Sequence, residues 1–155
     1  MDIRNRTAVV TGAASGIGRA LADALHARGA KLIVADRDGE GLRQVANEVD
    51  GHAVLMDVAS PEDNDRLAKI AGSPTLLCLN AGVTSTATGP VWEASPDEWR
   101  RVLDINLGGV INGLRAFIPR MLDDLQRHHV LVTASLAGLA TWPGEAPTPL
   151  RSTPS

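Results

Sequence analysis

Three glycines lie close together near the start of the chain, in the stretch VVTGAASGIGRAL (residues 9–21). Gly12, Gly16 and Gly18 fall between a short apolar run, residues 7–11, and a segment whose apolar residues have helical spacing. A strand that turns this tightly into a helix needs residues without a Cβ, so that backbone N–H groups and the helix N-terminus can approach a pyrophosphate. The spacing therefore predicts a phosphate-binding loop; the alternative is a glycine-rich turn that binds no ligand.

An acid ends the next apolar run, KLIVAD (residues 31–36). Asp36 follows the glycines by about twenty residues, the separation expected of a dinucleotide-binding unit. Its carboxylate can accept hydrogen bonds from both hydroxyls of an adenosine ribose and would repel a 2′-phosphate. We therefore expect NAD rather than NADP, with Arg37 offsetting part of the repulsion. The alternative is that Asp36 caps a helix.

Apolar runs and helical segments alternate along the chain. Ser60-Pro61 and Ser95-Pro96 each place an N-cap serine before a proline at the first helical position, and Glu98 completes a capping box. Strands are expected at residues 7–11, 31–36, 52–57, 75–80 and 129–135, and helices near 17–28, 41–49, 61–71 and 96–125. Five strands alternating with four helices predict an α/β fold, a Rossmann-like doubly wound parallel sheet buried on both faces. This domain covers residues 1–138, and an irregular tail covers 139–155.

The motifs resemble those of the short-chain dehydrogenase/reductase family, over about residues 5–147. Thr11-Gly12-x-x-x-Gly16-Ile17-Gly18 resembles its glycine signature, and Asp57-Val58 resembles the pair that meets the adenine ring. Asn80-Ala81-Gly82 matches the motif that supports the sheet and lines the cofactor site. The residues expected to bind the cofactor are Thr11, Gly12, Ser15, Gly16, Ile17, Gly18, Asp36, Arg37, Asp57, Val58, Asn80, Ala81 and Gly82.

The resemblance implies hydride transfer between NAD(P) and a secondary alcohol or carbonyl compound, with Asn106 and Ser135 as catalytic residues. Asn106 matches the asparagine that holds a proton-relay water, and Ser135 the serine that orients the substrate oxygen. The family also uses a tyrosine about thirteen residues after the serine, and a lysine four residues later that lowers the phenol pKa from its ordinary value of about 10. Those places hold Thr148 and Ser152, and the sequence contains no tyrosine. We therefore expect an oxidoreductase by descent that is catalytically incomplete.

Two alternatives remain open: an NAD-binding module without turnover, and a product that folds poorly. The tail TWPGEAPTPLRSTPS (residues 141–155) suggests how the catalytic pair was lost. Synonymous codons for its last nine residues can read YAASKHAV in a neighbouring frame, so one hypothesis is a one-base deletion near the Pro147 codon. The chain would then be truncated, the fifth strand would become a sheet edge or lie next to one, and the homo-oligomers of full-length relatives would be doubtful here. The alternative is a genuine divergent C-terminus.

The charge, the single cysteine and the positions of the histidines argue against several other classes of function. The net charge of −3 argues against a nucleic-acid or anionic-membrane partner. Cys78 is the only cysteine, which excludes an intrachain disulfide and predicts a buried, inert thiol. His128 and His129 are adjacent, point to opposite faces of a strand and are expected on the surface, so no metal site is predicted. Without a signal-peptide pattern or a membrane-length apolar run, we expect a cytoplasmic protein.

Overall fold

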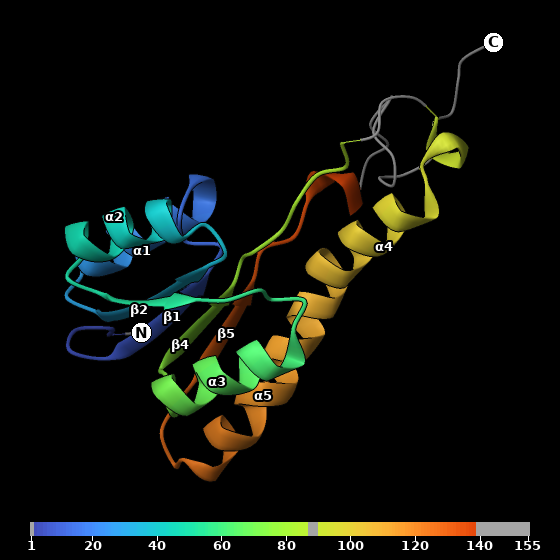
Figure 1. Cartoon of the computed structure of the whole chain (residues 1–155). Helices are drawn as coiled ribbons and strands as arrows, with labels where there is room; N and C mark the ends of the chain where they lie inside the picture. The colour runs from blue at the N-terminus through green and yellow to red at the C-terminus, as the bar shows by residue number, and fades with distance from the viewer. Residues whose placement is uncertain (1, 87–89, 139–155) are drawn as a thin grey trace.

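Strands and helices alternate in the computed structural model, which describes residues 2–86 and 90–138 (Figure 1). The strands are β1 (Thr7–Thr11), β2 (Lys31–Asp36), β3 (His52–Leu55), β4 (Leu76–Leu79) and β5 (His129–Val132). The α-helices are α1 (Gly16–His26), α2 (Gly39–Glu48), α3 (Pro61–Ala71), α4 (Pro96–Leu103) and α5 (Gly109–Asp123).

The five described strands are parallel and lie in the order β3-β2-β1-β4-β5. β1 is central, since Val9 pairs with Ile33 of β2 on one side and with Leu77 of β4 on the other. The chain moves from β1 to β2 and β3, then crosses back to β4, so the strand order reverses between β1 and β4. In open α/β sheets, ligands bind outside the carboxyl ends of the strands at such a point.

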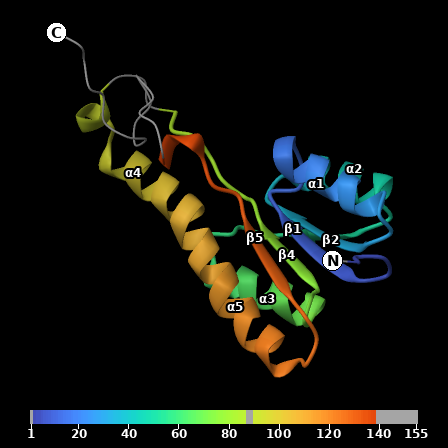
Figure 2. The ribbon, with the colours of Figure 1, turned by 180° about the vertical axis from the view of Figure 1, so that it is seen from behind.

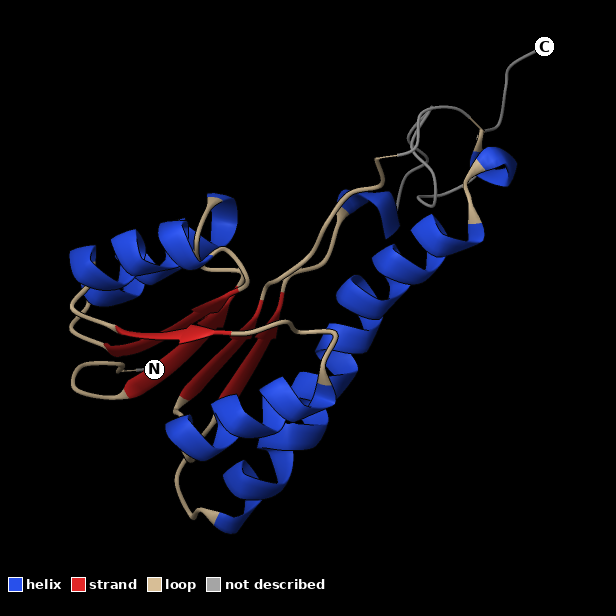
Figure 3. Cartoon of the chain, in the orientation of Figure 1, coloured by secondary structure: helices blue, strands red, loops and turns tan. Residues whose placement is uncertain are grey.

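Helices cover both faces of the sheet (Figures 2 and 3). On β1, Ala8 and Val10 belong to the core under α1 and α2, whereas Val9 belongs to the core under α3 and α5. This alternation follows the two-residue period of a strand. Because both faces are buried, the strands read as continuous apolar runs, and the doubly wound α/β fold expected from the sequence is confirmed.

The two serine caps form as predicted, but the capping box does not. The hydroxyl oxygens of Ser60 and Ser95 accept hydrogen bonds from the backbone N–H groups of Asp63 and Glu98, each at 3.1 Å. In a full capping box the Glu98 carboxylate would turn back to the backbone of Ser95. It instead contacts Arg101 and the segment after β4, because partners from another part of the fold lie within its reach.

The long helix expected from residue 96 onward is interrupted. A π-helical turn, Asp104–Gly108, joins α4 to α5, and α5 ends at Asp123. A π turn carries an extra residue and occurs often at functional sites. Beyond it, a Cβ on Gly113 would lie 2.6 Å from Cδ2 of Leu79, so α5 packs directly against β4.

β5 is an edge strand in the described part of the chain, as the sequence predicts. Val130, Leu131 and Val132 are 36%, 40% and 45% exposed, unlike the fully buried residues of β4. The strand ends at Val132, three residues earlier than expected, although the Thr133 N–H still donates to the Leu79 carbonyl oxygen at 3.1 Å. An open strand edge with exposed apolar side chains favours association with other chains.

Cys78 provides a chemical test of this sheet. It lies in β4 with 0% exposure, and burial raises the pKa of its thiol to about 11. Since the thiolate is the reactive form, we expect the native chain to react with a disulfide reagent at about pH 8 more than about 100-fold slower than the guanidinium-unfolded chain. Thiol release followed by absorbance measures both rates. Rapid, stoichiometric labelling of the native chain would contradict the buried position.

The expectation that both histidines lie on the surface is wrong for His128. Its side chain is 9% exposed, and Nδ1 lies 2.8 Å from the Pro74 carbonyl oxygen. Its Nε2 is 3.4 Å from a carboxylate oxygen of Asp124, whereas His129 is exposed. The ring is covered because the chain turns from α5 into β5 here. The alternation of side chains along a strand does not predict such a turn.

Among residues 2–86 and 90–138, no three His, Cys, Asp or Glu side chains are grouped so as to hold a metal ion. No helix in the same ranges combines the length and apolar character needed to cross a membrane.

Candidate functional site

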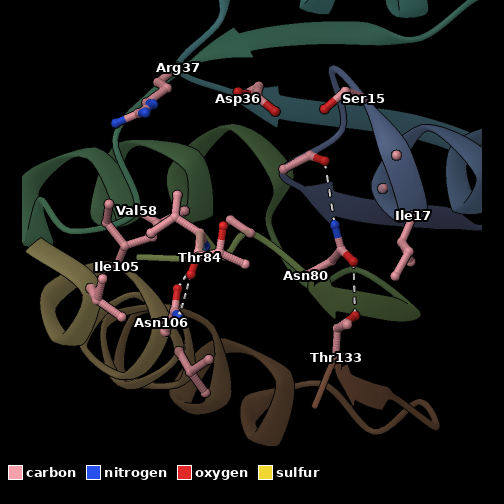
Figure 4. A pocket seen from close by; sticks show the side chains of 18 of the residues that line it. Ser15, Ile17, Asp36, Arg37, Val58, Asn80, Thr84, Ile105, Asn106 and Thr133 are labelled. Atoms are coloured by element: carbon pink, nitrogen blue, oxygen red, sulfur yellow. Dashed lines mark hydrogen bonds between the residues drawn. The ribbon is translucent and has the colours of Figure 1, made fainter. Parts of the chain in front are cut away.

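A cavity of about 670 Å³ opens at the carboxyl ends of the strands, at the reversal of strand order (Figure 4). Its walls come from the segments after β1, β2, β3, β4 and β5 and from the helical segment around the π turn. The predicted site residues that line it are Gly12, Ser15, Gly16, Ile17, Gly18, Asp36, Arg37, Asp57, Val58, Asn80, Ala81, Gly82, Asn106 and Ser135. The fold therefore brings together residues spread over most of the chain.

The glycine loop allows α1 to approach the end of β4. A Cβ on Gly18 would lie 1.9 Å from the carbonyl oxygen of Gly12 and 2.7 Å from Nδ2 of Asn80. Gly12 has a φ of +67°, and a Cβ there would lie 2.7 Å from Cα of Ala81. Larger residues at these two positions would push the helix away from the cavity.

The N-terminus of α1 is suited to an anionic group. The N-cap Ser15 makes no side-chain capping bond, whereas the N-cap side chains of α2, α3 and α4 all accept backbone N–H groups. Ser15, Gly16 and Ile17 line the cavity. The first N–H groups of a helix have no partner within it, and the helix dipole favours negative charge at this end.

Asp36 is fixed at the end of β2. Its Oδ2 accepts the Ala14 N–H at 2.9 Å and its Oδ1 the Asp38 N–H at 3.0 Å. Each carboxylate oxygen can accept a further hydrogen bond. The helix-cap alternative is wrong for this residue, because Asp38 caps α2 by accepting the N–H groups of Glu40 and Gly41.

The segment after β3 is held from two helices. The Val58 carbonyl oxygen accepts hydrogen bonds from the side-chain amides of Asn64 in α3, at 2.9 Å, and Asn112 in α5, at 3.2 Å. A Cβ on Gly109 would lie 2.8 Å from Cγ2 of Val58, so α5 is in direct contact with this wall. Asp57 beside it is exposed.

Asn80 connects the ends of three strands, and Figure 4 shows its side chain directed at Thr133. Its Nδ2 donates to the Thr11 carbonyl oxygen at 3.1 Å, and its Oδ1 accepts from the Thr133 hydroxyl at 2.9 Å. Thr11 does not line the cavity, contrary to the expectation that it contacts the cofactor: it is 2% exposed. Its hydroxyl oxygen accepts the N–H groups of Asn80 and Ala81 and donates to the Cys78 carbonyl. Thr11 thus holds the backbone of Asn80 and Ala81, which line the cavity, without contacting the cavity itself.

Asn106 lies in the π turn and lines the cavity. Its Oδ1 accepts the Val83 N–H at 2.8 Å, and its Nδ2 donates to the Val83 carbonyl at 2.9 Å. The side chain therefore fixes the backbone of the segment after β4. That it holds a relay water stays a prediction. Ser135 lines the same cavity from the segment after β5.

An acid at the end of β2, a glycine loop and an open helix N-terminus around one cavity form a site for a dinucleotide. A sequence profile described as short chain dehydrogenase matches residues 6–147. The chain belongs to the short chain dehydrogenase family.

Relatives in this family are identical to the chain at about a third of the aligned positions. An uncharacterized oxidoreductase of Listeria monocytogenes is 37% identical, over 94% of this chain and 61% of its own length. A 1-deoxy-11-beta-hydroxypentalenate dehydrogenase of Streptomyces avermitilis is 37% identical, over 94% of this chain and 57% of its own. A solved short chain dehydrogenase/reductase from Burkholderia phymatum in complex with NAD superposes with a TM-score of 0.89 at 36% identity, covering 94% of this chain and 54% of its own. The chain thus spans little more than half the length of these relatives.

Two predicted positions cannot be placed in the site, and several lining residues were not predicted. Thr148 and Ser152, at the places of the family tyrosine and lysine, lie outside the described residues. Cavity-lining residues that the sequence did not indicate are Met56, Val83, Val102, Ile105, Val110, Thr133 and Ala134. For Thr133 a signal existed, since it directly follows the end of a parallel strand.

Proposed function

We propose that this short chain dehydrogenase binds NAD in preference to NADP across the cavity, and that its family reaction is hydride transfer with a small secondary alcohol or ketone. The fixed carboxylate of Asp36 carries the proposal. Because the Ala14 and Asp38 amides hold it in place, it can accept ribose hydroxyls without reorganisation, and its charge opposes a 2′-phosphate. Exposed Arg37 offsets only part of that charge.

The other parts of the cavity fit the rest of a dinucleotide. The N-terminus of α1, with Ser15, Gly16 and Ile17, would hold the pyrophosphate. Val58 would lie against the adenine ring, and Asn80-Ala81-Gly82 would line the path toward Ser135. A bound nicotinamide supplies the hydride chemistry, and Ser135 would orient the substrate oxygen.

We further propose that the 155-residue chain is a cofactor-binding unit without turnover. No tyrosine occurs in it, and its lysines, Lys31 and Lys69, lie in β2 and α3. Neither element contributes the phenol–ammonium pair that the family uses to move the hydroxyl proton.

Asp36→Asn tests the cofactor choice. We expect NAD to bind the unmodified chain at least about tenfold more tightly than NADP, and the variant to lose about 10- to 100-fold in NAD affinity and most of this discrimination. Calorimetric titration with each dinucleotide gives both constants. Asp38→Asn is the matched control, because it removes one charge from the same segment but caps α2 outside the cavity lining. An unchanged NAD-to-NADP ratio in Asp36→Asn would contradict the proposal.

A further inference from the structure

The segment after β4, Val83–Thr86, is held at four consecutive residues by the helical segment that follows it. Asn106 binds both backbone groups of Val83. Arg101 donates to the Thr84 carbonyl oxygen at 2.9 Å. The segment has no regular secondary structure of its own, so these side chains determine its position.

Glu98 holds the other end of the segment. Its Oε1 accepts the Ser85 hydroxyl at 2.9 Å, the Thr86 N–H at 2.6 Å and the Thr86 hydroxyl at 3.3 Å. The same carboxylate receives two bonds from Arg101, Nε to Oε2 at 2.9 Å and an Nη2 bond to Oε1 at 2.8 Å. Two oxygens thus accept five hydrogen bonds, and the bonds from Arg101, Thr86 and Ser85 hold the pKa of Glu98 well below its ordinary range.

This pair differs from an ordinary ion pair on a helix surface. The side chains of Arg101 and Glu98 are 32% and 13% exposed, whereas those of Arg100 and Asp97, at the same three-residue spacing in α4, are 68% and 89% exposed. An exposed pair of this spacing contributes little beyond the helix itself. The Glu98–Arg101 pair instead connects α4 to a loop that lines the cavity.

The loop it holds lies away from the adenosine end of the cavity. Val83, Thr84 and Ser85 line the cavity, and Figure 4 shows Thr84 beside Asn106 and away from Asp36 and Arg37. With the adenosine ribose on Asp36 and the pyrophosphate at α1, the second half of a dinucleotide would extend into the part of the cavity lined by Val83–Ser85 and Ser135.

We propose that Glu98 and Arg101 are positioning residues that set the Val83–Ser85 wall for the nicotinamide half of the dinucleotide. The inference rests on the proposed NAD binding and extends it to two residues outside the family motifs. If the wall is correctly placed only part of the time, the apparent Kd for NAD rises in inverse proportion to that fraction. Ligands that end at the pyrophosphate do not reach the wall, and their binding is unaffected.

Glu98→Gln tests whether the pair affects binding of the nicotinamide half of NAD and not of the adenosine half. The amide keeps the size of the side chain, but its NH₂ group faces the donor groups of Arg101. We expect NAD to bind about tenfold more weakly while ADP binds within about twofold of the unmodified chain. Arg101→Lys, which keeps the charge but not the two-pronged contact, should show the same NAD-specific loss. Asp97→Asn, in the exposed pair, should change neither constant.

A second measurement does not depend on ligand. Amide hydrogen exchange at Thr86, whose N–H donates to Glu98, should be faster in Glu98→Gln while exchange in β1 and β4 stays unchanged. Equal weakening of NAD and ADP, or unchanged NAD binding, in both Glu98→Gln and Arg101→Lys would overturn the positioning role. If the unmodified chain binds neither ADP nor NAD, the proposed function fails first, and the inference fails with it.

Discussion

Gly18→Ala is expected to abolish detectable NAD binding and to lower the free energy of unfolding by about 3 kcal/mol, the upper end of the usual cost of overpacking. The added Cβ would meet the Gly12 carbonyl oxygen at 1.9 Å and Nδ2 of Asn80 at 2.7 Å. Neither contact is with the mobile end of a long side chain, so the start of α1 must move. That movement displaces the helix N-terminus from the place where a pyrophosphate would bind.

Calorimetry and a denaturant titration measure the two effects separately. Gly72→Ala is the control: this glycine has a φ of +65° and nothing within 4 Å of a Cβ, and it lies after α3 outside the cavity lining. We expect it to lose about 1–3 kcal/mol of stability from backbone strain and to bind NAD normally. A Gly18→Ala chain that binds NAD as the unmodified chain does would show that the close approach of α1 is not needed.

The 155-residue chain is expected to oxidise secondary alcohols with NAD at a rate about 10⁴-fold or more below that of an enzyme with a proton-transferring tyrosine. Hydride transfer leaves a hydroxyl proton that must go to a base, and a threonine or serine hydroxyl is a far weaker one than a lysine-assisted phenolate. NADH formation over a panel of small secondary alcohols, followed by absorbance, measures the rate.

Binding must be measured in the same preparation, so that absent turnover is not confused with an unfolded chain. Ser135→Ala and Gly18→Ala serve as controls for contaminating enzymes. Turnover that disappears in both variants belongs to this chain and would contradict the proposed lack of catalysis. Turnover that persists in both comes from another protein.

Much of the fold follows from local patterns. The apolar runs that become β1, β2 and β4 are buried on both faces, so their composition alone indicates a parallel sheet. Ser60 and Ser95 begin helices because a short hydroxyl side chain can satisfy a free N–H group regardless of the surrounding fold. The glycine loop and Asp36 could be placed together because the alternation of strand and helix brings the ends of β1 and β2 to one edge.

The remaining features depend on contacts between distant segments. Local spacing predicted that Glu98 would turn back to its own helix start, but the segment after β4 offers it better donors. Thr11 belongs to a ligand-binding motif, yet its hydroxyl oxygen accepts hydrogen bonds from the backbone N–H groups after β4. His128 is covered by the turn between α5 and β5. In each case the partner lies far away in the sequence or is positioned by tertiary packing, which periodicity does not encode.

The π turn between α4 and α5 determines which residues of α5 face the sheet. An α-helix advances about 100° per residue, so the extra residue in Asp104–Gly108 shifts the residues after it by about that angle from where an uninterrupted α-helix would place them. If the same residues formed an uninterrupted α-helix, Gly113 would no longer face Leu79, and a bulkier neighbour would be placed against β4. A single helical wheel drawn across the whole segment therefore assigns the wrong residues to the interior on one side of the turn. The segments before and after residue 104 should therefore be drawn as two separate helical wheels when sequences of this region are compared.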